Sequence, residues 1–284
     1  MPDMHESVNT LEHAPFMAYF KSVLDAKKFT ETIKCLEVGC GPGYFAELLK
    51  EEYQDKIKIT AIDPSECAIS AAKSKASGNV DFRQATITDL GAEQLYDVIL
   101  FSKSLHHVAS LEETLGKAYG LLKPNGTLIA EEFDRDAVDE HTARWFLDRV
   151  DLLNSAQRLT DASSANDHQR HRRARMLDAS VDAFQRWQGF FSHHNSQHHE
   201  FNHGHHHDMF SFQDVRCGIE KIFQKDNTKM GPKLPFLHHL LVHFGLEDTD
   251  AGKSTLATFI SQEEAAIKDG LIGATGVTVI AEKK

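Results

Sequence analysis

The chain of 284 residues lacks several features that define common protein classes. It has no apolar run of 18 residues, so a membrane-spanning helix and a membrane partner are not expected. Residues 1–9 are polar and acidic, which does not fit a secretory signal, and the expected location is the cytoplasm. The four cysteines show neither disulfide-type pairing nor metal-ligand spacing, which fits a reducing compartment. They are Cys35, Cys40, Cys67 and Cys217.

Positive charge is also scarce. The chain has 31 basic and 42 acidic residues, which gives a net charge of −11 with histidine neutral. Such a protein is poorly suited to hold a phosphate backbone, so RNA and DNA are not expected as substrates. Oligomeric state has no signature in the sequence, which leaves a monomer or a homodimer.

Strand-like and helix-like segments alternate in the first half of the chain. Residues 96–101 form a nearly continuous apolar run, which is typical of a strand buried on both faces. The alternation predicts an α/β fold with a parallel sheet and right-handed crossovers. Ligands of such folds bind outside the carboxyl ends of the strands. The five expected strands are residues 33–38, 56–63, 80–84, 96–101 and 127–133.

A glycine-rich turn follows the first strand. Gly39, Gly41 and Gly43 can adopt positive φ and leave no Cβ against a ligand, while Cys40 is a small filler between them. A helix after the turn would direct N–H groups to a polar ligand. The dinucleotide fingerprint has the spacing G-x-G-x-x-G, whereas this turn reads G-x-G-x-G with Glu37 before it. A buried carboxylate would repel a pyrophosphate but suits an ammonium. A tight turn without a ligand is the alternative.

The E-x-G-x-G-x-G pattern resembles motif I of the class I methyltransferases that depend on S-adenosyl-L-methionine (SAM). The second strand ends in Asp63, followed by Pro64 and Ser65, which is similar to the "D-P-S" of that family. Two later turns are also similar to family turns: Leu-His-His-Val at 105–108 and Lys-Pro-Asn-Gly at 123–126. The resemblance implies that Asp63 accepts both ribose hydroxyls, although a helix N-cap is the simpler alternative.

The resemblance implies an α/β fold with a Rossmann-like seven-stranded sheet, helices on both faces and a helical, His-rich insertion or lid. The implied cofactor is SAM, with S-adenosyl-L-homocysteine (SAH) as its product. Thr86 stands where the family often has an aspartate for the adenine, and Ile87 either packs on the adenine or belongs to the core. The implied cofactor-binding residues are Glu37, Gly39, Cys40, Gly41, Gly43, Asp63, Pro64, Thr86, Ile87 and Ser102.

Methyl transfer is an in-line displacement that requires positioning and the exclusion of water. A general base is needed only if the acceptor carries a proton, and histidine titrates near neutrality. The catalytic candidates are His106, His107 and Glu132. We expect His106 to face the pocket and His107 to be buried. Glu131, Glu132 and Asp134 either bind an amine acceptor or act as a base; the alternative is that they are solvated loop acids.

The second half of the chain contains a histidine-rich segment, residues 193–207. Imidazole is a good ligand for Zn²⁺, Ni²⁺ or Cu²⁺, but solvated His tracts are common and no metal site is predicted. The aromatic residues around this segment favour an ordered helical lobe, and the resemblance implies that such an insertion shapes the acceptor pocket. The eight histidines are His193, His194, His198, His199, His203, His205, His206 and His207.

Four parts of the chain are expected. A helix is predicted at residues 12–29; the resemblance implies that it covers the cofactor, and the alternative is that it packs on the sheet. The last strand is predicted at residues 276–281 and the sixth around 226–234, and the resemblance implies that the two form an antiparallel edge. The parts are an N-terminal helical lid (1–30), a SAM-binding core (31–156), a His-rich acceptor lobe (157–225) and C-terminal helices and closing strands (226–284).

The favoured function is a SAM-dependent methyltransferase that acts on an N, O or S nucleophile of a small molecule. A SAM-binding regulatory or partner protein without turnover would carry the same glycine turn. A metal-binding protein that uses the His-rich segment is a further alternative. A dehydrogenase is disfavoured by the glycine spacing and by Glu37.

Overall fold

The computed structural model describes residues 7–75, 80–160, 173–191 and 209–284. These residues form two compact units. The sheet unit consists of Ala14–Phe133, Met209–Leu234 and Gly276–Lys284. The helical unit consists of the described residues within Met1–His13, Asp134–Asp208 and Pro235–Thr275. The four parts expected from the sequence are a different division of the chain, and they stay a prediction.

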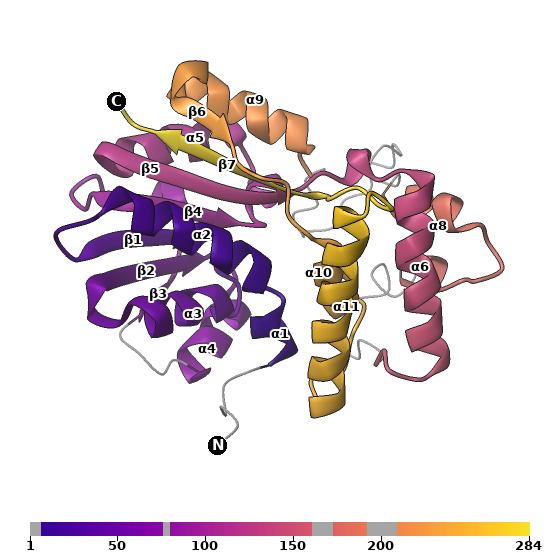
Figure 1. Ribbon diagram of the computed structural model, residues 1–284. Coiled ribbons are helices and arrows are strands. Elements are labelled where there is room, and N and C mark those ends of the chain that lie inside the picture. The colour runs from indigo at the N-terminus through magenta and orange to yellow at the C-terminus, as the bar shows by residue number, and fades with distance from the viewer. Residues whose placement is uncertain (1–6, 76–79, 161–172, 192–208) are drawn as a thin grey trace, which may run out of the picture. The chain divides into compact units, whose positions relative to one another are not determined.

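The described strands of the sheet unit form one seven-stranded sheet with the order β3-β2-β1-β4-β5-β7-β6 (Figure 1). Strands β1 to β5 run parallel, and β7 is antiparallel to both β5 and β6. The Rossmann-like sheet and its antiparallel edge are therefore confirmed. The strands are β1 (Ile33–Val38), β2 (Ile57–Asp63), β3 (Val80–Gln84), β4 (Tyr96–Ser102), β5 (Leu122–Phe133), β6 (Thr228–Met230) and β7 (Gly276–Glu282).

Strand β5 begins earlier than predicted. Leu122 already pairs with Tyr96, and the register is irregular before Val98 pairs with Thr127. Asn125 has a φ of 62°, so the Lys-Pro-Asn-Gly turn is a left-handed kink in the first part of the strand. This segment was predicted as a turn because Pro, Asn and Gly are typical both of turns and of kinks within a strand.

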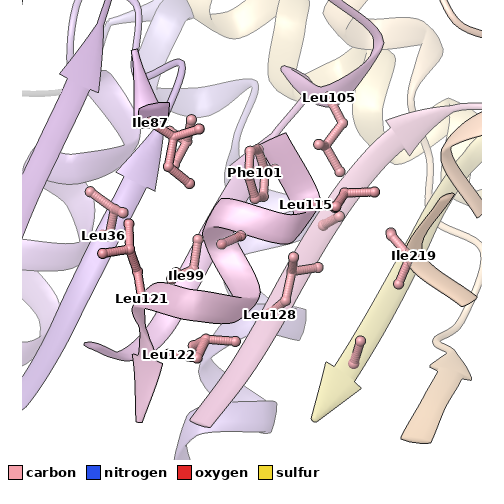
Figure 2. Close-up of a cluster of buried hydrophobic side chains, with 14 of the residues drawn as sticks. Leu36, Ile87, Ile99, Phe101, Leu105, Leu115, Leu121, Leu122, Leu128 and Ile219 are labelled. Atoms are coloured by element: carbon pink, nitrogen blue, oxygen red, sulfur yellow. The ribbon is translucent and has the colours of Figure 1, made fainter. Parts of the chain in front are cut away.

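Both faces of the sheet are buried, as the apolar pattern of β4 predicted. Val98 and Leu100 belong to one core cluster, whereas Ile99 and Phe101 belong to the other. Because successive side chains of a strand point to opposite faces, two covered faces need apolar residues at every position. Figure 2 shows part of the cluster on the α5 face, with Ile87 among its labelled members.

Helices cover both faces of this sheet (Figure 1). The first cluster takes side chains from α2 (Ala14–Lys27), α3 (Tyr44–Tyr53) and α4 (Glu66–Lys75); the second takes them from α5 (Leu111–Leu121) and α9 (Phe212–Phe223). Helix α2 buries Phe16, Phe20 and Leu24 in the first cluster. Helix α2 thus packs on the sheet, which was one of its two predicted roles. The other role, as a lid over the cofactor, stays a prediction.

The helical unit is built from α1 (Val8–Leu11), α6 (Glu140–Ser155), α8 (Ala183–Phe191), α10 (Leu237–His243) and α11 (Asp250–Lys268). Phe146 of α6 is fully buried and has ring contacts with Trp187, Phe244 and Phe259. The aromatic residues of α8 therefore do belong to an ordered helical structure. The His-rich segment 193–207 lies outside the described residues.

A buried histidine–glutamate pair joins α10 to α11. Glu263 is 1% exposed and accepts the backbone N–H groups of Phe236, Leu237 and His238 at 2.7, 2.8 and 3.2 Å. The His238 ring contacts Glu263 through Nδ1 and the carbonyl oxygen of Glu12 through Nε2, both at 2.9 Å. The carbonyl oxygen of Glu12 can only accept, so Nε2 of His238 donates to it, while Nδ1 lies against the Glu263 carboxyl group.

None of the helices among the described residues is long and apolar enough to cross a membrane. No group of three or more His, Cys, Asp or Glu side chains among the described residues could hold a metal ion.

Candidate functional site

The glycine turn connects β1 to α3. Gly39, Gly41 and Gly43 have φ values of 73°, 50° and 81°, as predicted. A Cβ on Gly39 would lie 2.5 Å from Cβ of Ser104, whereas a Cβ on Gly41 would meet no atom of the described chain within 4 Å. Gly39 is thus required for close packing against Ser104, whereas Gly41 leaves its backbone open to a ligand.

Asp63 ends β2 and is bonded directly to this turn. Its Oδ2 accepts the Gly41 N–H and its Oδ1 accepts the Ser65 N–H, both at 2.9 Å. The bond to Ser65 is a local capping bond, as expected if Asp63 serves as a helix N-cap. Each carboxylate oxygen has two acceptor sites, so Asp63 keeps capacity for hydroxyl groups of a ligand. Pro64 follows it and is exposed.

Glu37 lies at the end of β1, before the turn, and is 2% exposed. Its Oε2 is buried and has no hydrogen-bond partner in the part of the chain that the structure describes. Burial raises the pKa of Glu37 to about 8; Lys103 opposes this rise and Asp63 adds to it. A buried, unpartnered carboxylate is costly. Glu37 can therefore gain a great deal from a cationic or N–H-bearing ligand.

The loop after β4 ties the glycine turn to β5. The Ser102 hydroxyl donates to Oε2 of Glu131 at 3.1 Å, and the Ser104 hydroxyl donates to the Val38 carbonyl at 2.6 Å. The Lys103 N–H donates to the Glu131 carbonyl at 2.8 Å with a φ of 59°. Sequence reasoning missed Lys103 and Ser104; a lysine and a small residue directly after a central strand are a weak signal for them.

His106 and Glu132 form a pair at the end of the sheet. Glu132 is 2% exposed; its Oε1 accepts the Leu105 N–H at 2.8 Å, and its Oε2 contacts Nδ1 of His106 at 2.5 Å. The side chain of His106 is 20% exposed. Because the carboxylate accepts, Nδ1 of His106 donates, and in a neutral ring Nε2 then carries the lone pair. Two of the three catalytic candidates are thereby brought together.

The expected burial of His107 is wrong, since this side chain is exposed. The three residues Leu105–His107 form the short 3-10 helix η3, which turns only Leu105 into the core. The rings of His106 and His107 lie 4.0 Å apart by their centroids. The description of Glu131 and Glu132 as solvated loop acids is also wrong, because both are buried on β5. Asp134 belongs to the helical unit.

Thr86 and Ile87 have local structural roles. The backbone N–H and the hydroxyl of Thr86 donate to Oδ2 of Asp89 at 2.8 and 2.7 Å, which caps the 3-10 helix η2 (Ile87–Asp89). Ile87 is buried in the core cluster of Figure 2, which fits the core alternative. Contacts of both residues with an adenine stay a prediction.

Comparisons with known proteins assign the family. The methyltransferase domain family matches residues 29–190, more than half of the chain, so the chain belongs to this family.

The chain is 35% identical over 118 residues to a malonyl-[acyl-carrier protein] O-methyltransferase of Priestia megaterium, covering 41% of this chain and 43% of the relative. It is 32% identical over 106 residues to a ubiquinone biosynthesis O-methyltransferase of Rickettsia felis, covering 36% and 42%. These matches span less than half the length of each relative.

The solved structure of the plantazolicin methyltransferase BamL, in complex with a triazolic desmethyl analogue and SAH, has a TM-score of 0.53 and 14% identity. The match covers 97% of this chain and 86% of BamL. At this identity the likeness shows a common fold.

Proposed function

We propose that this protein is a SAM-dependent methyltransferase that transfers a methyl group to a small-molecule acceptor. The observation that carries the proposal is the buried carboxyl group of Glu37, whose Oε2 has no hydrogen-bond partner among the described residues, beside the open backbone of Gly41. Membership of the methyltransferase domain family supports it, as do the O-methyltransferase relatives and the SAH bound to BamL.

The residues at the glycine turn fit the chemical groups of SAM. An ammonium matches the unsatisfied carboxylate of Glu37, and two neighbouring ribose hydroxyls match the acceptor capacity left on Asp63. The open face of Gly41 allows a ligand to lie against the backbone, with Cys40, Gly43 and Pro64 around it. Ser102 would act through its bond to Glu131, which fixes the loop.

When bound, SAM supplies a methyl group on a sulfonium, which an acceptor nucleophile displaces in line. The protein's own task is to hold the two reactants in that geometry and to exclude water. We assign His106 as the general base and Glu132 as the residue that orients it. His107, also a candidate from the sequence, is exposed and is assigned a minor role.

Calorimetric titration with SAH tests the cofactor assignment. We expect one site per chain with micromolar affinity and a loss of binding in Glu37→Gln and Asp63→Ala. Glu66→Gln removes an exposed carboxylate at the start of α4 and is the matched control. Absence of SAH binding in the unaltered protein would refute the proposal. Binding without methyl transfer to any acceptor would favour a regulatory protein that binds SAM without turnover.

We further propose a cytoplasmic protein that acts without nucleic acid as substrate. The net charge of −11 supports the second point, because it opposes the binding of a phosphate backbone. Fractionation of cells that express the protein and a salt-dependent RNA-binding assay would test the two statements.

A further inference from the structure

We propose that Lys103 is a cofactor-binding residue that holds the carboxylate at the amino acid end of SAM, beside the ammonium site at Glu37. The proposal rests on the methyltransferase function proposed above and adds to the cofactor site a residue for which the sequence motifs predict no role. It is carried by the hydrogen bonds that fix the backbone around Lys103 and by the charges beside the glycine turn.

The backbone around Lys103 is fixed from both sides. Before it, the Ser102 hydroxyl donates to Oε2 of Glu131, and the N–H of Lys103 itself donates to the Glu131 carbonyl at 2.8 Å. After it, the Ser104 hydroxyl donates to the carbonyl of Val38, the last residue of β1, at 2.6 Å. These three consecutive residues therefore connect β5 to β1, and Lys103 is the middle one.

The backbone of Lys103 itself is strained. Its φ is 59°, in the left-handed region that residues other than glycine, asparagine and aspartate seldom adopt. Such strained residues persist only where the surrounding structure holds them, and they cluster at ligand sites. The hydrogen bonds on either side supply that restraint here. Because a glycine would relieve the strain, the presence of a lysine indicates a role for its side chain.

Lys103 also lies next to the glycine turn. A Cβ on Gly39 would lie 2.5 Å from Cβ of Ser104, so the residue that follows Lys103 is in contact with the turn. Lys103 is partly exposed, and its charge acts on the buried Glu37: burial raises the pKa of Glu37, and Lys103 opposes this rise. A cation and a carboxyl group are thus within electrostatic reach of each other, close to the open backbone of Gly41.

This pair of charges matches the amino acid end of SAM. An α-amino acid carries its ammonium and its carboxylate on one carbon atom, so its binding site needs a charge of each sign at close range. Oε2 of Glu37, which has no hydrogen-bond partner among the described residues, can accept from the ammonium. Glu37 and Asp63 would repel the ligand carboxylate. Lys103 offsets this repulsion, and its ammonium group on a flexible stem can donate to the carboxylate.

The alternative role for Lys103 is that of a counter-ion, which stabilises Glu37 without touching the ligand. A counter-ion acts through Glu37, so its loss changes the affinity for every ligand that carries the ammonium, with or without a carboxylate. A lysine that binds the carboxylate adds a further loss, which affects only ligands that have this group. Ligands that lack one of the two groups therefore separate the two roles.

Calorimetric titration with SAH and two truncated analogues tests the assignment. Decarboxylated SAH keeps the ammonium, and SAH without its α-amino group keeps the carboxylate. In the unaltered protein, loss of the carboxylate should weaken binding roughly 10- to 100-fold, as expected for a hydrogen bond between charged groups. In Lys103→Met the same change of ligand should cost less than about threefold, whereas loss of the α-amino group should still weaken binding.

Three further variants complete the test. Lys103→Arg keeps the positive charge and should keep the preference for the carboxylate. Lys103→Gly removes the side chain together with the strain, so its Tm should be at least that of Lys103→Met, and it should show the same loss of preference. Lys73→Met changes an exposed lysine on α4 and is the matched control, with the three affinities unchanged.

Two results would overturn the role of Lys103. One is a carboxylate whose loss weakens binding as much in Lys103→Met and Lys103→Gly as in the unaltered protein, which would leave Lys103 as the counter-ion of Glu37. The other is equal affinity of the unaltered protein for SAH and decarboxylated SAH. Absence of SAH binding to the unaltered protein would instead refute the proposed function, and this proposal with it.

Discussion

The two units each bury a glutamate, and the two carboxylates are treated in opposite ways. In the helical unit, Glu263 accepts three backbone N–H groups and contacts the ring of His238. In the sheet unit, Oε2 of Glu37 has no partner among the described residues. A carboxylate that holds a fold together is satisfied by its own chain. One that is left unsatisfied at the edge of an open turn is available to a ligand.

The largest expected effect concerns the satisfied carboxylate. Glu263→Ala would remove the buried carboxyl group that accepts three backbone N–H groups and contacts the His238 ring, at a cost of about 3–5 kcal/mol in unfolding free energy. Denaturant titration measures this cost. Glu264→Ala, its exposed neighbour on α11, should stay within about 0.5 kcal/mol of the unaltered protein. A similar small loss in both variants would show that the pair is not a structural element.

A second contrast separates two glycines of the same turn. Gly39→Ala should lower the unfolding free energy by about 2–4 kcal/mol, from the left-handed φ and the clash with Ser104. Gly41→Ala carries the φ strain alone, about 1–2 kcal/mol, but places a methyl group on the open face and should weaken SAH binding. Denaturant titration and calorimetry measure the two effects.

The Gly39 clash has its own control. In the double variant Gly39→Ala, Ser104→Gly the Cβ of residue 104 is absent, so part of the loss should be recovered. Strictly additive losses would mean that the contact between these two positions is not the cause.

The raised pKa of Glu37 should make the stability of the protein depend on pH. The pKa of Glu37 is raised from 4.5 to about 8, so the ligand-free folded state binds more protons than the unfolded state between these values. Its stability should therefore fall as pH rises from about 5 to 8, by roughly 1–3 kcal/mol relative to Glu37→Gln. Tm measured against pH for both proteins gives the difference. A constant difference over this range would contradict the raised pKa.

The smallest effect is expected at the exposed neighbour of the catalytic candidate. His107→Ala should change kcat less than about threefold, because the His107 side chain is exposed, whereas the His106 ring is held against the buried Glu132. Steady-state kinetics of the two alanine variants, side by side, measure the contrast. A loss in His107→Ala as large as in His106→Ala would move the base to the other histidine.

The sheet unit was readable from the sequence because its signals are local. The apolar run of β4, the glycines at 39–43 and the acid at 63 each specify their own backbone or face. The exposure of His107 was not readable, since it depends on the length of η3, which turns only Leu105 into the core. Glu263 gave no signal at all, because the groups that satisfy it come from residues 236–238, far away along the chain.

The close contact of Gly39 with Ser104 has a consequence for redesign of the enzyme. The Ser104 hydroxyl donates to the Val38 carbonyl directly before the glycine turn, and Ser104 lies two residues before His106. A change at Ser104 therefore acts on both the glycine turn and the loop that carries His106. On the proposed function, we predict that grafting or randomising residues 102–106 would lower SAH affinity, and that changes to the acceptor range are better made at residues outside this loop.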